Sequence, residues 1–379
     1  MKGQREVVAA SLAAARAGHP GVLVTVVRVE GSAYRRPGAR MFLPQDGPAV
    51  GLVSGGCLEA DLAERAAAVL ASNEPRTLLY DMQSPDDLVW GLGLGCNGVV
   101  RVLLEPIGRS AVPPRDLAFI AECDRDRREG VVVTVFGSSA LTGPAVGDRI
   151  LVDAQGNVRT KPQADDTILQ RWQAEAQAAL SSRRSRVVHV AEDNAVVDAL
   201  VEYLQPAIRL VICGAGLDAL PVVEQATALG WTVHVVDHRE TNATRERFPG
   251  ATTVGTVAWN ALTPTDVPLD ARTAVVVMTH HFLNDAEILT SLAGRAPEFV
   301  GLLGPKQRAD NLVRELGERN VPIATAFRDC LHGPAGLDVG SETPEEIALS
   351  LIAEIQAHFA GRSGGMLRDH TGPLHDWND

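Results

Sequence analysis

Two cysteines of this 379-residue chain lie in glycine-rich turns that could present a thiol to a ligand. Cys57 follows Gly55 and Gly56 in GLVSGGCLEADLAERAA and directly precedes a segment with the apolar spacing of a helix. A thiol at a helix N-terminus has a lowered pKa, because unpaired N–H groups and the helix dipole favour its anion. The thiolate would be a nucleophile or a soft-metal ligand, and the same N–H groups could instead hold a phosphate. A buried cysteine that fills a tight turn is the simpler alternative.

Cys96 lies in the second glycine-rich stretch, GLGLGCNGVV, beside Asn97. The glycine density there exceeds the needs of a simple turn and would let the backbone approach a ligand closely. The remaining cysteines have no such setting: Cys123 lies on a charged amphipathic helix, Cys213 ends an apolar strand and Cys330 precedes a loop. Five scattered cysteines without a C-x-x-C pair exclude a zinc ribbon and indicate a reducing, cytoplasmic setting.

A third candidate is the basic loop YRRPGAR, which contains Arg35 and Arg36. Two guanidinium groups on a rigid loop could bind a phosphate or a carboxylate through paired hydrogen bonds, whereas the alternative is an exposed charged turn. The formal net charge of −12 argues against a nucleic acid or an anionic membrane as partner, but it permits a local basic pocket. No apolar run approaches the length of a membrane span, and no signal-peptide core follows the first residues.

An internal repeat places these candidates on one half of a duplicated fold. The segment GVLVTVVRVEGSAYRRPGARMFLPQDG, from Gly21, aligns without gaps with GVVVTVFGSSALTGPAVGDRILVDAQG, from Gly130, at an offset of 109 residues. Each copy is expected to follow a helix and to precede a further helix and strand. The second copy has no counterpart of YRRPG, SGGC or GLGLGCNG. We therefore place the site in the first half and expect the second half to be a scaffold.

The remainder of the chain has the pattern of a Rossmann domain. A buried strand leads into a glycine turn with Gly214 and Gly216, in which alanine replaces the last glycine of the G-x-G-x-x-G pattern. Asp237 ends the second strand, 23 residues after Gly214, close to the spacing of about 20 in such units. Thr343 and Glu346 predict a capping box at the last helix. We predict an α/β chain in which a doubly wound parallel-sheet domain follows two related α/β halves, with these segments: 1–110, 111–205, 206–361 and an irregular tail, 362–379.

Charged residues follow three strands of this domain at the carboxyl ends, where α/β sheets bind ligands. Arg239 follows Asp237 and would suit a phosphate better than a bare ribose. His280 follows AVVVM, and Lys306 follows FVGLL near a helix start. Because adjacent side chains point in different directions, we do not expect His280 and His281 to share a metal. An NAD(P)-dependent oxidoreductase, with its substrate in the N-terminal half, is one reading of these residues.

GSAYRRPGARM, VSGGCLEADL, GLGLGCNG, VMTHHFLND and GLLGPKQR, in this order, resemble the xanthine dehydrogenase accessory protein family (XdhC/CoxI type) over nearly the whole chain. The resemblance implies an N-terminal XdhC/CoxI domain and a C-terminal Rossmann domain. It also implies a role in maturing molybdenum hydroxylases: binding molybdenum cofactor, favouring its sulfurated form with a cysteine desulfurase, and passing it to the apo-enzyme. The family's glycine–cysteine turns fall on Cys57 and Cys96, and its GSxxRxxG loop on Ser32 and Arg35 or Arg36.

The chain departs from the family in its C-terminal motifs. Many members have T-H-D-H where this chain has His280 and His281, and a G-S-R-R-like turn where it has Lys306. We expect a cytoplasmic, homodimeric chaperone rather than an enzyme, with molybdopterin or its cytosine dinucleotide form as cofactor and Cys57 and Cys96 as candidate molybdenum ligands. An NAD(P)-dependent oxidoreductase and a purely structural interaction protein are the alternatives. The candidate cofactor-binding residues are Ser32, Arg35, Arg36, Gly55, Gly56, Cys57, Cys96 and Asn97 in the first half, and Gly214, Gly216, Asp237, Arg239, His280 and Lys306 in the Rossmann domain.

Overall fold

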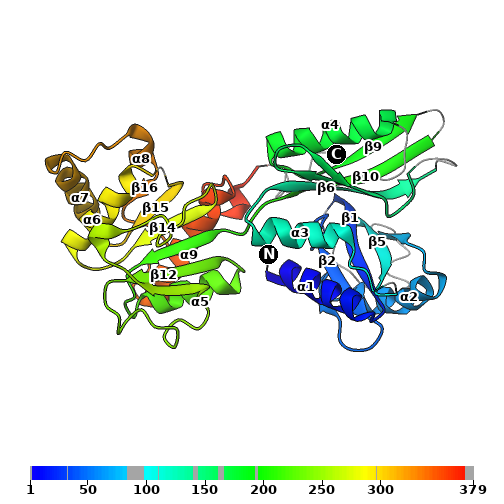
Figure 1. The fold of residues 1–379 in the computed structure, drawn as a ribbon, viewed down its shortest axis with the longest axis horizontal. Coiled ribbons are helices and arrows are strands. Elements are labelled where there is room, and N and C mark those ends of the chain that lie inside the picture. Colours follow the sequence, from blue (N-terminus) through cyan, green and yellow to red (C-terminus); the bar gives the residue numbers. More distant parts are fainter. Residues whose placement is uncertain are drawn as a thin grey trace. The chain divides into compact units, whose positions relative to one another are not determined.

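The chain folds into two compact units, Gly3–Pro206 and Ala207–Leu374 (Figure 1). This computed structural model describes residues 2–31, 33–82, 98–109, 111–139, 144–160, 166–192, 195–295 and 297–371. Within these ranges, no helix combines the length and the apolar character needed to cross a membrane.

The N-terminal unit consists of two halves with the same order of elements, which confirms the predicted duplication (Figure 1). The strand orders β3-β2-β1-β5-β4 and β8-β7-β6-β10-β9 are identical once equivalent strands are matched, and the strand pairs described in both sheets are antiparallel. The first half contains α1 (Lys2–Ala17), β1 (Gly21–Gly31), β2 (Arg40–Pro44), β3 (Val50–Gly51), α2 (Glu59–Ser72), β4 (Arg76–Asp81) and β5 (Gly98–Ile107). The second half contains α3 (Arg115–Arg125), β6 (Gly130–Ser138), β7 (Arg149–Asp153), β8 (Val158–Thr160), α4 (Asp166–Ser182), β9 (Arg186–Glu192) and β10 (Ala195–Leu204).

Helices cover both faces of each sheet in this unit. In the first half, Leu62 of α2 packs with Val24 of β1, and α4 covers the equivalent face of the second sheet. The other faces share one core with α1 and α3, which includes Leu12, Leu23 and Leu117 (Figure 1). Because both of its faces are covered, β1 is an almost continuous apolar run rather than an alternating one.

Two ion pairs, related by the repeat, join the halves. Arg40 of β2 bonds the carboxylate of Glu202 on β10, with Nη1–Oε1 at 2.8 Å and Nη2–Oε2 at 2.5 Å. Arg149 of β7 bonds Glu105 of β5 in the same way, at 2.7 and 2.5 Å. Burial alone would lower the pKa of Arg40, but the Glu202 carboxylate raises it above its usual value. Each half thus supplies one arginine and one glutamate to the interface.

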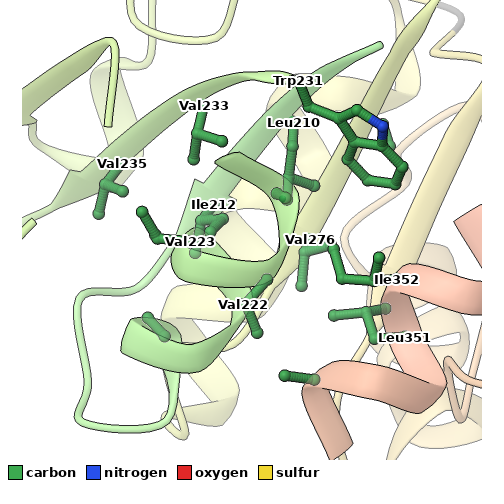
Figure 2. Close-up of a cluster of buried hydrophobic side chains, with 14 of the residues drawn as sticks. Leu210, Ile212, Val222, Val223, Trp231, Val233, Val235, Val276, Leu351 and Ile352 are labelled. Carbon is green, nitrogen blue, oxygen red and sulfur yellow. The ribbon is translucent and has the colours of Figure 1, made fainter. Parts of the chain in front are cut away.

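The C-terminal unit is a six-stranded parallel sheet with the order β13-β12-β11-β14-β15-β16, which confirms the predicted doubly wound fold. Helices α5 and α9 cover one face, where Val222 and Leu351 pack on strand residues such as Ile212 (Figure 2). The other face is covered by helices that include α6, with Ile288 and Leu289. Its elements are β11 (Arg209–Cys213), α5 (Ala219–Ala228), β12 (Thr232–Asp237), β13 (Thr253–Thr256), the 3₁₀ helix η2 (Trp259–Ala261), β14 (Thr273–Val277), α6 (Phe282–Ala293), β15 (Phe299–Leu302), α7 (Lys306–Glu318), α8 (Thr325–Asp329), β16 (Leu331–His332), α9 (Pro344–Phe359) and η3 (Leu367–Asp369).

The predicted capping box begins α9. The Thr343 hydroxyl accepts the N–H of Glu346 at 3.4 Å, and the Glu346 carboxylate accepts the N–H of Thr343 at 2.9 Å. The signal was readable from the sequence because all of its partners lie within four residues.

Gly214 holds the glycine turn against the neighbouring strand. Its φ is +126°, and a β-carbon added there would lie 2.5 Å from the carbonyl oxygen of Met278, which follows β14. Both the backbone conformation and the close approach therefore require glycine.

Replacing Gly214 by alanine is expected to destabilise the C-terminal unit by about 3 kcal/mol, because the new methyl group combines left-handed strain with an overlap against backbone. Amide hydrogen exchange in peptides that cover β11 and β14 measures the loss. Gly255→Ala is the matched control, since an added β-carbon there meets nothing within 4 Å. Equal exchange rates in the two variants would contradict the assignment.

Candidate functional site

The cysteine turn between β3 and α2 is held by its own serine. The Ser54 hydroxyl oxygen accepts the backbone N–H groups of Gly56, Cys57 and Leu58 at 3.2, 3.1 and 3.1 Å. From the sequence, these N–H groups were candidates for binding a phosphate. They are already hydrogen-bonded to Ser54, so an anion at this place has to be bound by other groups.

Glu59, the first residue of α2, completes this cap. Its carboxylate accepts the N–H groups of Ser54 at 2.9 Å and Leu58 at 3.2 Å, together with the Ser54 hydroxyl. Burial alone would raise the pKa of Glu59, but these hydrogen bonds lower it below its usual value. A fixed negative charge therefore lies at the first residue of α2, directly after Leu58. Ser54 was not predicted as a capping residue, although its hydroxyl in S-G-G-C-x-E is a readable capping signal.

The Cys57 turn is open toward solvent on one side. Gly55 and Gly56 are exposed and Cys57 is half-buried. Gly56 has a φ of +110°, and an added β-carbon would meet nothing within 4 Å, so glycine is needed there for the backbone conformation and not for packing. The exposed ring of Tyr34 lies beside Gly55, where an added β-carbon would be 3.8 Å from the ring. The cysteine turn and the basic loop therefore meet at Tyr34, a residue that the sequence analysis did not single out.

The basic loop carries two arginines whose charges have no protein partner among the described residues. Arg35 and Arg36 are half-buried, and neither guanidinium group forms a hydrogen bond or an ion pair within that part of the chain. The Nε atom of Arg35 is buried without an acceptor, and burial lowers the pKa of Arg36. Arg40, at the end of the same loop, is by contrast fully paired with Glu202. The loop thus presents two guanidinium groups that an anionic ligand would satisfy.

Three predicted residues of this half, Ser32, Cys96 and Asn97, lie outside the described residues. Gly31 and Gly98, at the ends of β1 and β5, are register partners. Within the described ranges, no group of three or more His, Cys, Asp or Glu side chains is arranged to hold a metal ion. The role of Cys57 as a molybdenum ligand is therefore still a prediction.

In the C-terminal unit, the carboxylate of Asp237 is fully engaged by its neighbours. It accepts the N–H of Ala215 at 2.6 Å and the Arg239 guanidinium at 2.9 and 2.7 Å, and the side chain is 1% exposed. Burial alone would raise the pKa of Asp237, but the bonds from Arg239 and from the backbone lower it to about 2. Asp237, at the position where such units bind a ribose, therefore orients the glycine turn and Arg239. Arg239 is the group that faces solvent.

His280 links two loops at the centre of the sheet. Its Nε2 lies 2.7 Å from Oδ2 of Asp218, which follows the glycine turn after β11, whereas His280 follows β14. The strand order reverses between β11 and β14, and this is the place where doubly wound sheets bind ligands. His280 has a φ of +59°, a conformation that side chains rarely adopt and that is typical of functional loops. Asp218 was not predicted as a site residue, because its only signal in the sequence is an acid two residues after Gly216.

Of the neighbouring polar residues, some are bonded to other protein groups and one is exposed without an ion pair in the described residues. His281 caps α6, because its Nδ1 accepts the N–H of Asn284 at 3.4 Å. The two adjacent histidines therefore contact different residues. Arg308 is bonded to the buried Asp285 at 2.7 Å. Lys306 is exposed at the first turn of α7 and has no ion pair within the described ranges. Around the carboxyl ends of β11, β12 and β14, the structure thus brings together the glycine turn, Arg239 and His280.

A duplicated α/β unit with a glycine–cysteine turn, joined to a Rossmann unit, defines the class of protein. Residues 14–81 match the model of the XdhC and CoxI family, and residues 210–355 match the XdhC Rossmann domain. A Bacillus subtilis (strain 168) protein, described as a probable subunit of xanthine dehydrogenase, is 31% identical over 334 residues, which are 88% of this chain and 92% of that protein. The chain therefore belongs to the XdhC and CoxI family.

Two further relatives cover most of the chain. The "Molybdenum cofactor insertion chaperone PaoD" of Escherichia coli (strain K12) is 24% identical over 352 residues, which are 93% of this chain and 87% of PaoD. A crystal structure described as a xanthine dehydrogenase from Bacillus halodurans superimposes with a TM-score of 0.72 at 30% identity, covering 94% of this chain and 97% of that one. The fold is therefore shared along most of the chain.

The Asp237→Asn variant is expected to lose about 2 kcal/mol of stability at pH 7. The folded pKa of about 2 lies below the ordinary value of 3.8, so ionised Asp237 stabilises the fold above about pH 4, and this contribution disappears as the pH falls toward 2. The difference from the parent should therefore shrink below pH 4. Fluorine NMR of fluorotryptophan-labelled protein in urea measures it, because Trp231 and Trp259 are buried in this unit. The exposed Asp310→Asn variant is the control, and parallel pH profiles for parent and Asp237→Asn would contradict the prediction.

The thiols are expected to react with iodoacetamide in a fixed order. Burial raises the pKa of Cys123 and Cys330 to about 11 and that of Cys213 to about 12, so few of these thiols are ionised at pH 7.5. Half-exposed Cys57 should be alkylated at least about tenfold faster, as measured by peptide mass spectrometry in a Cys96→Ser background. The same labelling of a Cys57→Ser protein identifies the signal. Protection of Cys57 equal to that of Cys213 would show that the turn is closed.

Proposed function

We propose that this protein binds molybdenum cofactor on the first half of its N-terminal unit and assists its insertion into a molybdenum hydroxylase of the xanthine dehydrogenase or CO dehydrogenase type. The names of two relatives support the class of function: one is a molybdenum cofactor insertion chaperone and the other is a probable component of xanthine dehydrogenase. The site geometry supports the location.

One observation carries the proposal: two half-buried guanidinium groups without a described carboxylate partner directly follow Tyr34, whose ring lies beside an open glycine–cysteine turn. The chain has a formal net charge of −12, so carboxylates are abundant, yet none of those described pairs with Arg35 or Arg36. Partial burial of an unpaired charge costs free energy, and a bound anion would relieve that cost. The duplicated half has no comparable loop in its sequence, so the fold does not require it.

The chemistry of these groups fits the cofactor. Its phosphate would be bound by Arg35 and Arg36 through charge-assisted hydrogen bonds, and its molybdenum is thiophilic, which suits the Cys57 sulfur. The N–H groups of the cysteine turn are bonded to Ser54, so they hold the turn rather than the phosphate. In this proposal Ser32, Cys96 and Asn97 belong to the same binding surface, with Cys96 as the second thiol.

The C-terminal unit offers separate binding groups for a nucleotide. Arg239, His280 and Lys306 follow β12, β14 and β15 at the same edge of the sheet, and their N–H donors suit the phosphates of NAD(P) or of the cytosine dinucleotide form of the cofactor. We place an NAD(P)-dependent oxidoreductase second, because the Asp237 carboxylate that would accept a ribose hydroxyl is already bonded to Arg239. Equilibrium titration with NADPH against cytidine diphosphate distinguishes the two nucleotides.

The partners follow from the proposed reaction. An insertion chaperone has to contact the apo-hydroxylase, and sulfuration of the cofactor needs a sulfur donor such as a cysteine desulfurase. We propose that the protein acts with both as a homodimer in the cytoplasm. Copurification of an affinity-tagged chain with each partner, followed by mass spectrometry, tests these contacts separately from cofactor binding.

The cofactor content of the Arg35→Ala/Arg36→Ala variant is expected to be at least about tenfold lower than that of the parent. Each charge-assisted hydrogen bond that is lost contributes about 1.5–3 kcal/mol to binding. Molybdenum by mass spectrometry and oxidised pterin by fluorescence, on protein purified from a molybdenum-replete host, give the content. Arg183→Ala/Arg184→Ala is the matched control, since this Arg–Arg pair of the second half lies in an exposed turn after α4.

Unchanged content in the Arg35→Ala/Arg36→Ala protein would overturn the proposed binding surface. The role of the sulfur is tested separately with Cys57→Ser/Cys96→Ser, which should lose molybdenum while its fold, measured by circular dichroism, is unchanged. If this variant binds the cofactor as tightly as the parent, the thiols are not ligands.

A further inference from the structure

The basic loop of the first half ends in a backbone arrangement that is fixed close to the sheet. The N–H of Gly38 donates to the carbonyl of Val26 at 2.7 Å, and the N–H of Val26 donates to the carbonyl of Ala39 at 2.9 Å. Arg40 Nη1 donates to the carbonyl of Gly38 at 2.9 Å. The loop that carries Arg35 and Arg36 is therefore anchored at its carboxyl end through the side chain of Arg40.

The second half holds this anchor in place. Glu202, on β10, bonds both terminal nitrogens of Arg40, and the two side chains are 7% and 3% exposed. Gln4 Nε2 lies 3.4 Å from Oε1 of Glu202 and 3.5 Å from the Gly38 carbonyl. Gly38 has a φ of +88°, and an added β-carbon would be 2.8 Å from Glu202 Oε1. The carboxylate thus occupies the space that glycine leaves and fixes the guanidinium that holds the loop.

The repeat supplies the same anchor without a basic loop. Arg149 Nη1 donates to the carbonyl of Gly147 at 2.7 Å and to Glu105 at 2.7 Å, and Gly147 has a φ of +93°. The equivalent sequence, LTGPAVG, contains no arginine. The two anchors share the bonds to a glutamate and to a glycine carbonyl, while Arg149 also pairs with Asp116 at 2.9 Å. Only the Arg40 anchor ends a loop whose guanidinium groups have no described carboxylate partner.

We propose that Glu202 is a positioning residue of the cofactor site: through Arg40 and the Gly38 carbonyl, it holds the loop in the conformation that presents Arg35 and Arg36. The inference rests on the proposed function, since it assigns these two arginines to the cofactor. It gives the second half, which the sequence indicated as scaffold, a direct part in the site. A displacement of the loop by about 1 Å would weaken a bidentate contact strongly, because such contacts depend on direction as well as distance.

The test compares Glu202→Gln with Glu105→Gln. Each variant removes the glutamate charge from one of the two anchors. Arg149 keeps its ion pair with Asp116 in Glu105→Gln, so the thermal midpoint of each variant is measured beside its cofactor content. Glu202→Gln should reduce the molybdenum and pterin retained after purification about tenfold, as loss of supporting contacts around a site does, whereas Glu105→Gln should retain the parent's content. Equal content in the two variants, whether high or low, overturns the inference.

A second variant separates position from stability. Arg40→Met/Glu202→Met replaces the buried ion pair by apolar side chains, which is often neutral or stabilising, but it removes the hydrogen bond to Gly38. Cofactor content should stay about tenfold below the parent even when the thermal midpoint is restored. Recovery of content together with the midpoint would show that Glu202 acts only on stability.

The Arg35→Ala/Arg36→Ala protein shows whether a negative result contradicts the proposed function or only the role of Glu202. If that protein retains the parent's content, the binding surface is wrong. If it loses the cofactor and Glu202→Gln does not, only the positioning role of Glu202 is wrong.

Discussion

The N-terminal unit depends on the exchange of arginine–glutamate pairs between its halves. A guanidinium group that is buried without a carboxylate costs several kcal/mol, and the same holds for an unpaired carboxylate. Arg40 bonds Glu202 on β10 and Arg149 bonds Glu105 on β5, so each half supplies a carboxylate to an arginine of the other, and Arg149 also pairs with Asp116 of its own half. Together with the apolar core that α1 and α3 share, this exchange makes the duplicated halves one compact unit.

This symmetric frame carries an asymmetric surface. The strand orders and the Arg–Glu anchors correspond in the two halves, whereas the cysteine turn and the basic loop with Arg35 and Arg36 occur in one sequence copy only. Ser54 and Glu59 tie the backbone of the cysteine turn, so its N–H groups stabilise the start of α2 and the ligand-binding chemistry is left to side chains. In the Rossmann unit, Asp237 plays a comparable part, because its carboxylate orients the glycine turn and Arg239.

Much of the fold was predictable from the sequence, because its signals are local or periodic. The repeat at an offset of 109 residues predicted two like sheets, and the Gly214 turn with Asp237 predicted the parallel sheet. The candidate site was predictable in part: Cys57, Arg35 and Arg36 were identified by residue type and spacing. Tyr34, Asp218 and Glu202 were not, because each acts through a residue of a different loop or strand.

The sequence by itself determined the elements, their order and the positions that need glycine or a helix cap, since these depend on neighbours within a few residues. It also determined that the basic loop with Arg35 and Arg36 and the cysteine turn occur in the first half alone. Only the tertiary structure decided which charges are satisfied. Arg40 meets Glu202, 162 residues away, while Arg35 and Arg36 meet no carboxylate in the described part of the chain. The physical reason is that an ion pair between distant residues depends on which strands meet across the interface, and the spacing of residues along the chain does not specify which strands meet.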